Sequence, residues 1–251
     1  MTATAIPEAP FLTECAALHV ELLQHFQVTS DGLSLVLGRS GERLVAYLAL
    51  EDRSLARDHI AGALWPDASQ ARAAASLRRA LSLVRRHAPG LMHSSAHRLS
   101  LASGVSVDVR AQRHLIEAIT SGERVTANVD ELRLLRGDLL PDWDEPWLVA
   151  SKQELRQLRL ISLEAVAAAH LREDRPASAL AVALRVACEE PLRESAHRLV
   201  VEAHLAQGNW AEATHHYMNY RALLWTELGL RPGSGMETLM MPVLNDSFLT
   251  T

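Results

Sequence analysis

Apolar and polar residues alternate in two short stretches near the N-terminus, residues 18–22 and 33–37, and the turn residues Asp31-Gly32 lie between them. This alternation predicts antiparallel strands that each bury one face. Phe26 and Val28 resume the pattern after an offset that indicates a bulge. We therefore expect a small β platform at the start of the ordered chain.

The spacing of apolar residues becomes helical over residues 42–50, which predicts a first helix. A second, short helix should follow Ser54, a good N-cap residue, and should end at Pro66. A hairpin is expected with strands at residues 91–93 and 98–101, and a last strand at residues 105–109. Together with the long helix between Pro66 and the hairpin, this order of platform, three helices and hairpin predicts a winged helix.

The stretch Gln70–His87 predicts that long helix, and its two faces differ in chemistry. At about 100° per residue, Leu77, Leu81, Val84 and Ala74 form one narrow apolar stripe that should face the core. The opposite face is small and cationic. It carries Arg72, Arg79, Ser82 and Arg86 near its centre, and Arg78 and Arg85 flank the apolar stripe.

Negative charge is missing around this helix. Between Asp67 and Asp108 there is no Asp or Glu, while the same interval holds six arginines. A solvated helix usually mixes charges of both signs, whereas a helix that enters the major groove of DNA presents arginine forks and small hydroxyl groups. The alternative interpretation is an arginine-rich surface helix from a high-GC genome, because the whole chain holds 24 Arg and a single Lys.

The second half of the chain is helical throughout and repeats itself. The segment Ala169-His-Leu171 recurs 34 residues later, and Ala179 recurs as Ala213 at the same offset. The two repeats then cover residues 160–193 and 194–227, with the period of tetratricopeptide motifs. Small residues at these positions allow the paired helices to approach closely.

The two halves of the chain differ in net charge, and this difference favours the first half for contact with a polyanion. Residues 1–110 have a net charge of +1, from 11 basic and 10 acidic residues, and residues 111–251 have a net charge of −6, from 14 and 20. Only the first half can approach nucleic acid comfortably. Because there is no signal-peptide pattern or apolar membrane span, and Cys15 and Cys188 form no metal or redox motif, we expect a cytoplasmic, nucleoid-associated protein.

No stretch of the sequence has the pattern of a catalytic or metal site. His93 and His97 have a spacing that occurs in metal sites, but no third ligand lies close in sequence, and we interpret them as part of the hairpin. Gly233-Ser-Gly235 follows no strand and is interpreted as a turn, not a dinucleotide loop. We therefore predict no enzyme activity, no cofactor and no metal ion.

Six segments follow one another in the order found in the SARP-type transcription activators of actinobacteria, and the sequence resembles this family. With the 34-residue repeats, these segments extend over most of the chain. They are Leu44-Val-Ala-Tyr-Leu-Ala-Leu50, Leu64-Trp-Pro-Asp67, Ala75-Ser-Leu-Arg-Arg-Ala-Leu81, Val107-Asp-Val109, Arg136-Gly-Asp-Leu-Leu-Pro141 and Glu227-Leu-Gly-Leu-Arg-Pro232.

The resemblance implies a mainly α fold with a small β platform: an OmpR-like winged helix-turn-helix followed by an all-α, tetratricopeptide-like bacterial transcriptional activator domain. The expected domains are a flexible leader at 1–16, the winged helix at 17–110 and the activator domain at 111–251. The implied function is sequence-specific activation of transcription, commonly by two protomers on direct repeats of double-stranded promoter DNA. The implied partner is RNA polymerase, including its sigma factor, and we expect control of a biosynthetic gene cluster.

Carried onto this sequence, the resemblance assigns the recognition helix to Gln70–His87, the wing to about residues 93–101 and a loop that faces RNA polymerase to residues 65–69. The residues expected in that loop contact are Trp65, Asp67 and Ser69, although a Trp before a proline is also typical of a core position. From helical angle we expect base contacts from Arg72, Arg79, Ser82 and Arg86, phosphate contacts from Arg78, Arg85, His97 and Arg98, and a further DNA contact from Ser76.

A helical-repeat adaptor, or a ligand-sensing module whose winged helix contacts protein, is the alternative function. The interval of 40 residues without an acidic side chain is not expected in an adaptor. The arginine helix therefore favours the interpretation as a DNA-binding protein. A ligand-binding role of the repeats is compatible with either function.

Overall fold

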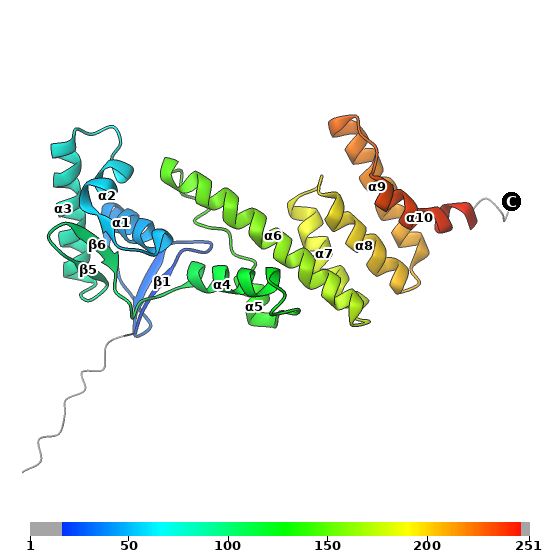
Figure 1. Cartoon of the computed structure of the whole chain (residues 1–251), viewed down its shortest axis with the longest axis horizontal. Coiled ribbons are helices and arrows are strands. Elements are labelled where there is room, and N and C mark those ends of the chain that lie inside the picture. The colour runs from blue at the N-terminus through cyan, green and yellow to red at the C-terminus, as the bar shows by residue number, and fades with distance from the viewer. Residues whose placement is uncertain (1–16, 247–251) are drawn as a thin grey trace, which may run out of the picture. The chain divides into compact units, whose positions relative to one another are not determined.

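The chain divides into two compact units, Met1–Asp108 and Val109–Thr251, and the computed structural model describes residues 17–246 of it (Figure 1). The leader that we expect at residues 1–16 lies outside the described residues. Within residues 17–246, no helix combines the length and apolar character that crossing a bilayer requires.

A small sheet with the strand order β3-β2-β1-β7 forms the platform of the first unit. Strand β1 runs antiparallel to β2, with Val20 opposite Val28, and parallel to β7. Both valines are buried, which confirms the alternation predicted there. The bounds are β1 Leu18–Glu21, β2 Gln27–Ser30, β3 Leu33–Ser34 and β7 Ser106–Val107.

The strands predicted at residues 33–37 and 105–109 are both shorter than expected. At the first, only Leu33–Ser34 pairs with β2, because β3 is an edge strand and Leu37 already belongs to the buried entry of helix α1. At the second, Asp108 begins helix α4. Its carboxylate accepts hydrogen bonds from the backbone N–H groups of Leu22 and Leu23 at 2.8–2.9 Å, which ends the strand.

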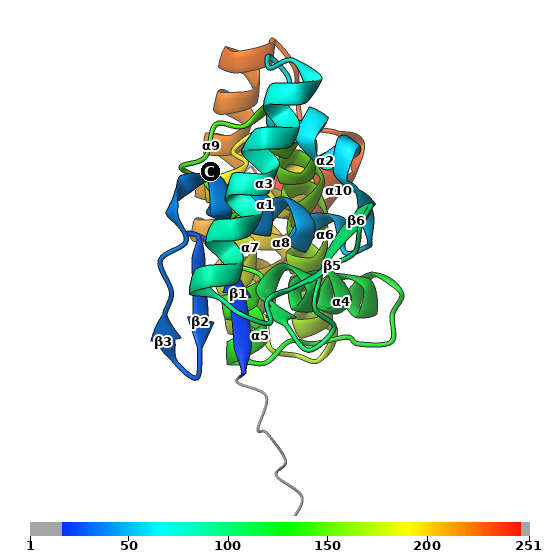
Figure 2. The same cartoon turned by 90° about the vertical axis from the view of Figure 1, so that its left-hand side faces the viewer.

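Three helices pack beside the platform, with α3 on the near side in Figure 2. They are α1 Gly38–Glu51, α2 Arg57–Leu64 and α3 Gln70–His87. Helix α1 begins four residues before the predicted start. The predicted cap at Ser54 is wrong, because the following residues, Leu55–Ala56, form a strand, β4, and α2 begins after it without a side-chain cap.

The strand β4 joins the predicted hairpin in a second sheet with the order β4-β6-β5. The hairpin consists of β5 Met92–Ser94 and β6 Arg98–Leu101, so the wing lies where the sequence predicts it. Leu99 of β6 faces Leu55 of β4 in the register and both are buried. The hairpin is therefore fixed to the core along β6.

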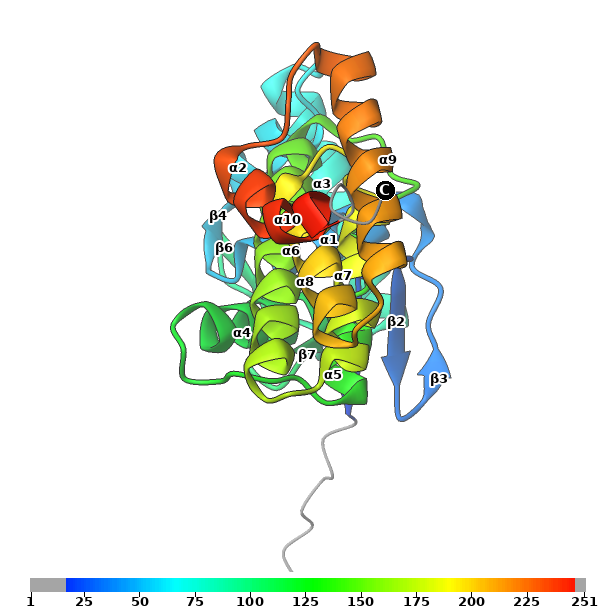
Figure 3. The ribbon, with the colours of Figure 1, turned by 90° about the vertical axis from the view of Figure 1, so that its right-hand side faces the viewer.

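The second unit is helical, as the repeat pattern predicts. Helices α6 to α9 each pack on the next one (Figures 1 and 3). Ala179 and Ala213 are fully buried, which confirms them as small packing positions of the two repeats. The bounds are α4 Asp108–Thr120, α5 Val129–Leu134, the 3-10 turn η1 Pro146–Leu148, α6 Val149–Arg172, α7 Pro176–Glu189, α8 Glu194–Ala206, α9 Trp210–Leu228 and α10 Ser234–Asp246.

Candidate nucleic-acid interface

The inner face of α3 is apolar and packs against α1 and α2. Relative to Leu77, the buried positions span helical angles from about −60° to about +40°. Ala74 lies just outside this arc and is only half-buried, so its predicted place in the apolar stripe is wrong. The buried residues are Ala73, Leu77, Ala80, Leu81 and Val84.

Gly41 sets how closely α3 approaches α1. A Cβ atom at Gly41 would lie 3.2 Å from Cγ2 of Val84 and 3.2 Å from Cβ of Leu37. Both contacts are tighter than ordinary carbon–carbon packing at about 3.5–4.0 Å. The absence of a side chain at Gly41 therefore lets Val84 dock closely against α1.

The outer face of α3 is cationic and exposed. Ser76 is half-buried, whereas every arginine of the helix and Ser82 are exposed. Among residues 17–108, as far as the structure describes them, no carboxylate forms an ion pair with an α3 arginine. The positive charge is therefore available to an outside partner. The exposed residues are Arg72, Arg78, Arg79, Ser82, Arg85 and Arg86.

The N-terminal end of α3 also favours contact with an anion. Its first turn holds no acidic residue, and its N-cap residue, Ser69, makes no side-chain capping bond. The first backbone N–H groups of a helix have no partner within it, and the helix dipole makes that end positive. A phosphate at this end would satisfy both conditions.

Two arginines brace the hairpin. Arg98 donates a hydrogen bond from Nε to the Ser54 hydroxyl at 3.1 Å, and its Nη2 donates to the Ser54 carbonyl. Arg57 donates from Nη2 to the Ser94 hydroxyl at 2.7 Å and to the Ser95 carbonyl at 2.9 Å. Much of the Arg98 guanidinium is thus occupied within the protein. His97 lies in the exposed turn between β5 and β6.

The loop that precedes α3 contains the three residues predicted to face RNA polymerase. Asp67 and Ser69 are exposed, and Trp65 is half-buried. The Arg43 guanidinium lies over the Trp65 ring, 5.8 Å from its centroid, and donates to the Leu64 carbonyl at 2.6 Å. Trp65 therefore anchors the loop, while Asp67 and Ser69 are its accessible side chains.

Sequence reasoning missed Arg57 and Arg43, which position the hairpin and the loop. Arg57 is the first residue of α2, where a positive charge opposes the helix dipole. This unfavourable position is the only feature of the local sequence that indicates that Arg57 binds a distant segment. Arg43 gives no such signal, because its partners at 64 and 65 come close only in the fold.

Comparison with known proteins agrees with this architecture. The family model described as the bacterial transcriptional activator domain matches residues 106–244, more than half of the chain. The regulatory protein AfsR of Streptomyces coelicolor is 29% identical in an alignment 244 residues long, which covers 92% of this chain and 24% of that protein. The chain thus spans about a quarter of the length of this curated relative.

A solved structure is also similar to the chain. EmbR of Mycobacterium tuberculosis, determined in complex with a low-affinity phosphopeptide, has a TM-score of 0.73 at 21% sequence identity. The likeness covers 92% of this chain and 66% of the EmbR chain. It concerns the fold, and it confirms the predicted fold class of a winged helix followed by a helical domain.

Proposed function

The chain belongs to the bacterial transcriptional activator domain family, among its SARP-type members, and from this premise we propose that it activates transcription by binding promoter DNA sequence-specifically. The first unit is the DNA-binding domain and the second is the activator domain. The observation that carries the proposal is the exposed arginine face of α3, which no carboxylate of the described first unit neutralises.

In this proposal α3 enters the major groove, which is wide enough for one helix. Arg79, Ser82 and Arg86, with Arg72, reach base edges from the centre of the outer face. Arg78 and Arg85 lie on the same flank of the buried stripe, two turns apart, and meet the phosphate backbone along one side of the groove. The N-terminal end of α3 supplies a further phosphate contact through its backbone N–H groups.

The hairpin β5–β6 lies along the neighbouring DNA backbone in this arrangement. His97, at its turn, is the side chain that contacts phosphate. Arg98 acts first as the brace of the hairpin through Ser54, and only its remaining N–H donors reach the DNA. Replacement of Arg98 should therefore weaken binding through the position of the wing as well as through lost charge.

The loop at residues 65–69 is the proposed contact with RNA polymerase, including its sigma factor. Asp67 and Ser69 are accessible there, and the stacking of Arg43 on Trp65 holds the loop in place. Two protomers bind direct repeats in the promoter of a biosynthetic gene cluster. AfsR is a regulatory protein, and the proposal assigns the chain no catalytic activity.

Footprinting on the promoters that flank its own gene tests this function, with and without RNA polymerase. We expect protection of two direct repeats by the wild type, loss of protection in the double variant Arg79→Ala/Arg86→Ala, and extended protection when polymerase is added. Arg172→Ala is the matched control, since this exposed arginine belongs to α6. Equal protection by the double variant and the control would refute the proposed interface.

A further inference from the structure

A pocket of about 530 Å³ lies within the second unit, between the segment that leads into α5 and the helices α6 and α7. Leu132, Leu163 and Val182 contribute apolar side chains to its wall. This volume falls within the range of about 300–1,000 Å³ typical of small-molecule sites. Neither the family resemblance nor the DNA-binding face accounts for this pocket.

The polar part of the pocket is positively charged. Arg136, Arg175 and Arg185 line it, and none of its lining residues is acidic. Within the described part of the chain, no carboxylate forms an ion pair with Arg185. An arginine retains its charge at neutral pH, so the pocket carries positive charge. Glu189 and Asp138 offset it at Arg185 only from beyond ion-pair distance. Glu173 offsets it at Arg175 through an ion pair of 3.6 Å.

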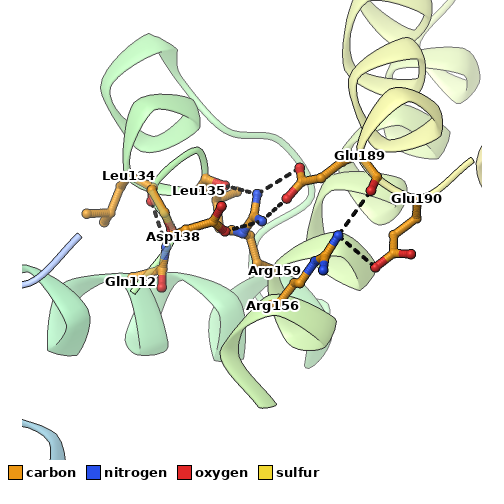
Figure 4. Close-up of polar contacts among 9 residues, drawn as sticks. Gln112, Leu134, Leu135, Asp138, Arg156, Arg159, Glu189 and Glu190 are labelled. Atoms are coloured by element: carbon orange, nitrogen blue, oxygen red, sulfur yellow. Dashed lines mark hydrogen bonds and ion pairs between the residues drawn. The ribbon is translucent and has the colours of Figure 1, made fainter. Parts of the chain in front are cut away.

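The carboxylates that could neutralise Arg185 are held by another arginine (Figure 4). Arg159 is almost fully buried, donates to Asp138 at 2.7 Å and forms an ion pair with Glu189. Its Nη1 donates at 3.1 Å to the second oxygen of Glu189. Arg159 therefore holds both carboxylates in direct ion pairs, and they act on Arg185 only at longer range.

Two buried nitrogen atoms at the pocket make no hydrogen bond. His170 is 5% exposed, and its Nδ1 has no hydrogen-bond partner in the described residues. The nearby Oε2 atom of Glu173 lies 3.9 Å away, beyond hydrogen-bonding distance. The Nε of Arg185 is likewise buried without a partner. A buried polar group left unsatisfied costs about 1–3 kcal/mol, which a ligand oxygen would recover.

Burial is the main cause of the altered titration of both groups. It lowers the pKa of His170, and the positive charge of Arg175 lowers this pKa further, so the imidazole is neutral at neutral pH. Burial also lowers the pKa of Arg185, and Arg136 lowers it further, while Glu189 and Asp138 act in the opposite direction. Like charges that crowd each other in this way favour a bound anion.

The N-terminus of α7 points to the same ligand chemistry. This helix has 14 residues and begins at Pro176, and its N-cap residue, Arg175, makes no side-chain capping bond. The backbone N–H groups of Ala177 and Ser178 have no partner within the helix, and the helix dipole is positive there. Ser178 itself lines the pocket.

We propose that this pocket binds a small organic anion whose oxyanion group meets Arg175, Arg185 and the N-terminus of α7. The Nδ1 atom of His170 completes the polar contacts, and the apolar part of the ligand lies against Leu132 and Val182. A carboxylate and a phosphate share this oxyanion chemistry. The site lies entirely within the second unit and does not rest on the proposed DNA binding.

Isothermal titration calorimetry of the full chain tests the proposal with four probes: octanoate, phenyl phosphate, inorganic phosphate and octanamide. We expect saturable binding of octanoate or phenyl phosphate, and the tighter of the two identifies the oxyanion. Binding should weaken by about tenfold or more in Arg185→Met and in Arg175→Ala, because each loses a charge-assisted hydrogen bond. The neutral octanamide should not bind.

Arg172→Ala is the matched control, because Arg172 is an exposed arginine near the end of α6 that does not line the pocket. Arg175→Ala also guards against misfolding of Arg185→Met, since the Arg175 side chain is 55% exposed. Three results would overturn the proposal: no organic anion binds better than octanamide, inorganic phosphate binds as tightly as both organic anions, or Arg175→Ala binds them as the control does.

Discussion

A comparison of Arg78→Ala with Arg79→Ala tests the division of roles on α3 most directly. The two residues are adjacent, both exposed, and neither has a partner in the described first unit. They differ in helical angle by about 100°. Arg79 lies at the centre of the outer face, and Arg78 lies beside the buried stripe, so the proposal assigns a base to one and a phosphate to the other.

The two variants should change different measured quantities. Loss of one phosphate contact reduces the slope of log K against log salt by about 0.9 and weakens binding to all duplexes alike. Loss of a bidentate arginine–base contact removes about 1–3 kcal/mol of discrimination, which is roughly 5- to 150-fold in the ratio of cognate to scrambled affinity. Arg78→Ala should therefore change the salt slope, and Arg79→Ala should change mainly the affinity ratio.

Fluorescence anisotropy at several salt concentrations measures both quantities, with the footprinted repeat and a scrambled duplex as ligands. Arg172→Ala again serves as the control for loss of one positive charge. If the two variants lose affinity equally on both duplexes, with equal salt slopes, then helical angle does not separate base from phosphate contacts. If neither differs from Arg172→Ala, α3 is not the DNA-binding helix.

Three further predictions follow from packing and burial within each unit. Gly41→Val should destabilise the first unit by about 1–3 kcal/mol in urea unfolding, because its side chain would collide with Val84 and Leu37; Gly62→Ala, where a Cβ atom meets nothing, is the control. Arg159→Met should cost about 1–3 kcal/mol, because Glu189 loses its partner while Asp138, whose side chain is 52% exposed, stays solvated; an unchanged midpoint would contradict this. Burial and the neighbouring His197 lower the pKa of His216 to about 4, so the unfolded state binds a proton first and unfolding free energy should fall as pH drops from 6.5 towards 4; His216→Asn should flatten this pH profile.

The sequence predicted the first unit well where the signals are local. The bounds of α3 agree with the prediction at both ends, and Pro89-Gly90 follows its C-terminal end in the sequence itself. The hairpin and the platform strands β1 and β2 followed from alternation alone. The 34-residue period predicted the stacking of α6 to α9, because consecutive repeats of this kind bury their apolar faces against each other.

Contacts between distant segments were not predictable in the same way. The strand β4 exists because Leu55 pairs with Leu99 of β6, 44 residues further along the chain. The local sequence after Ser54 equally suits a helix start. The pocket of the second unit depends on Arg136 and Arg185 facing one space, although neither residue is unusual in its own helix or loop.

The arginines of the chain occupy three different environments, and each environment gives them a different role. On α3 the arginines are exposed and have no partner in the described first unit, as contact with a polyanion requires. Arg159 is buried and holds two carboxylates, which stabilises the second unit. Arg185 lies between these cases, since it is partly buried, lines a pocket and pairs with no carboxylate in the described chain. Because α3 belongs to the first unit and Arg185 to the second, Arg79→Ala should leave anion binding at the pocket unchanged, and Arg185→Met should leave DNA binding unchanged.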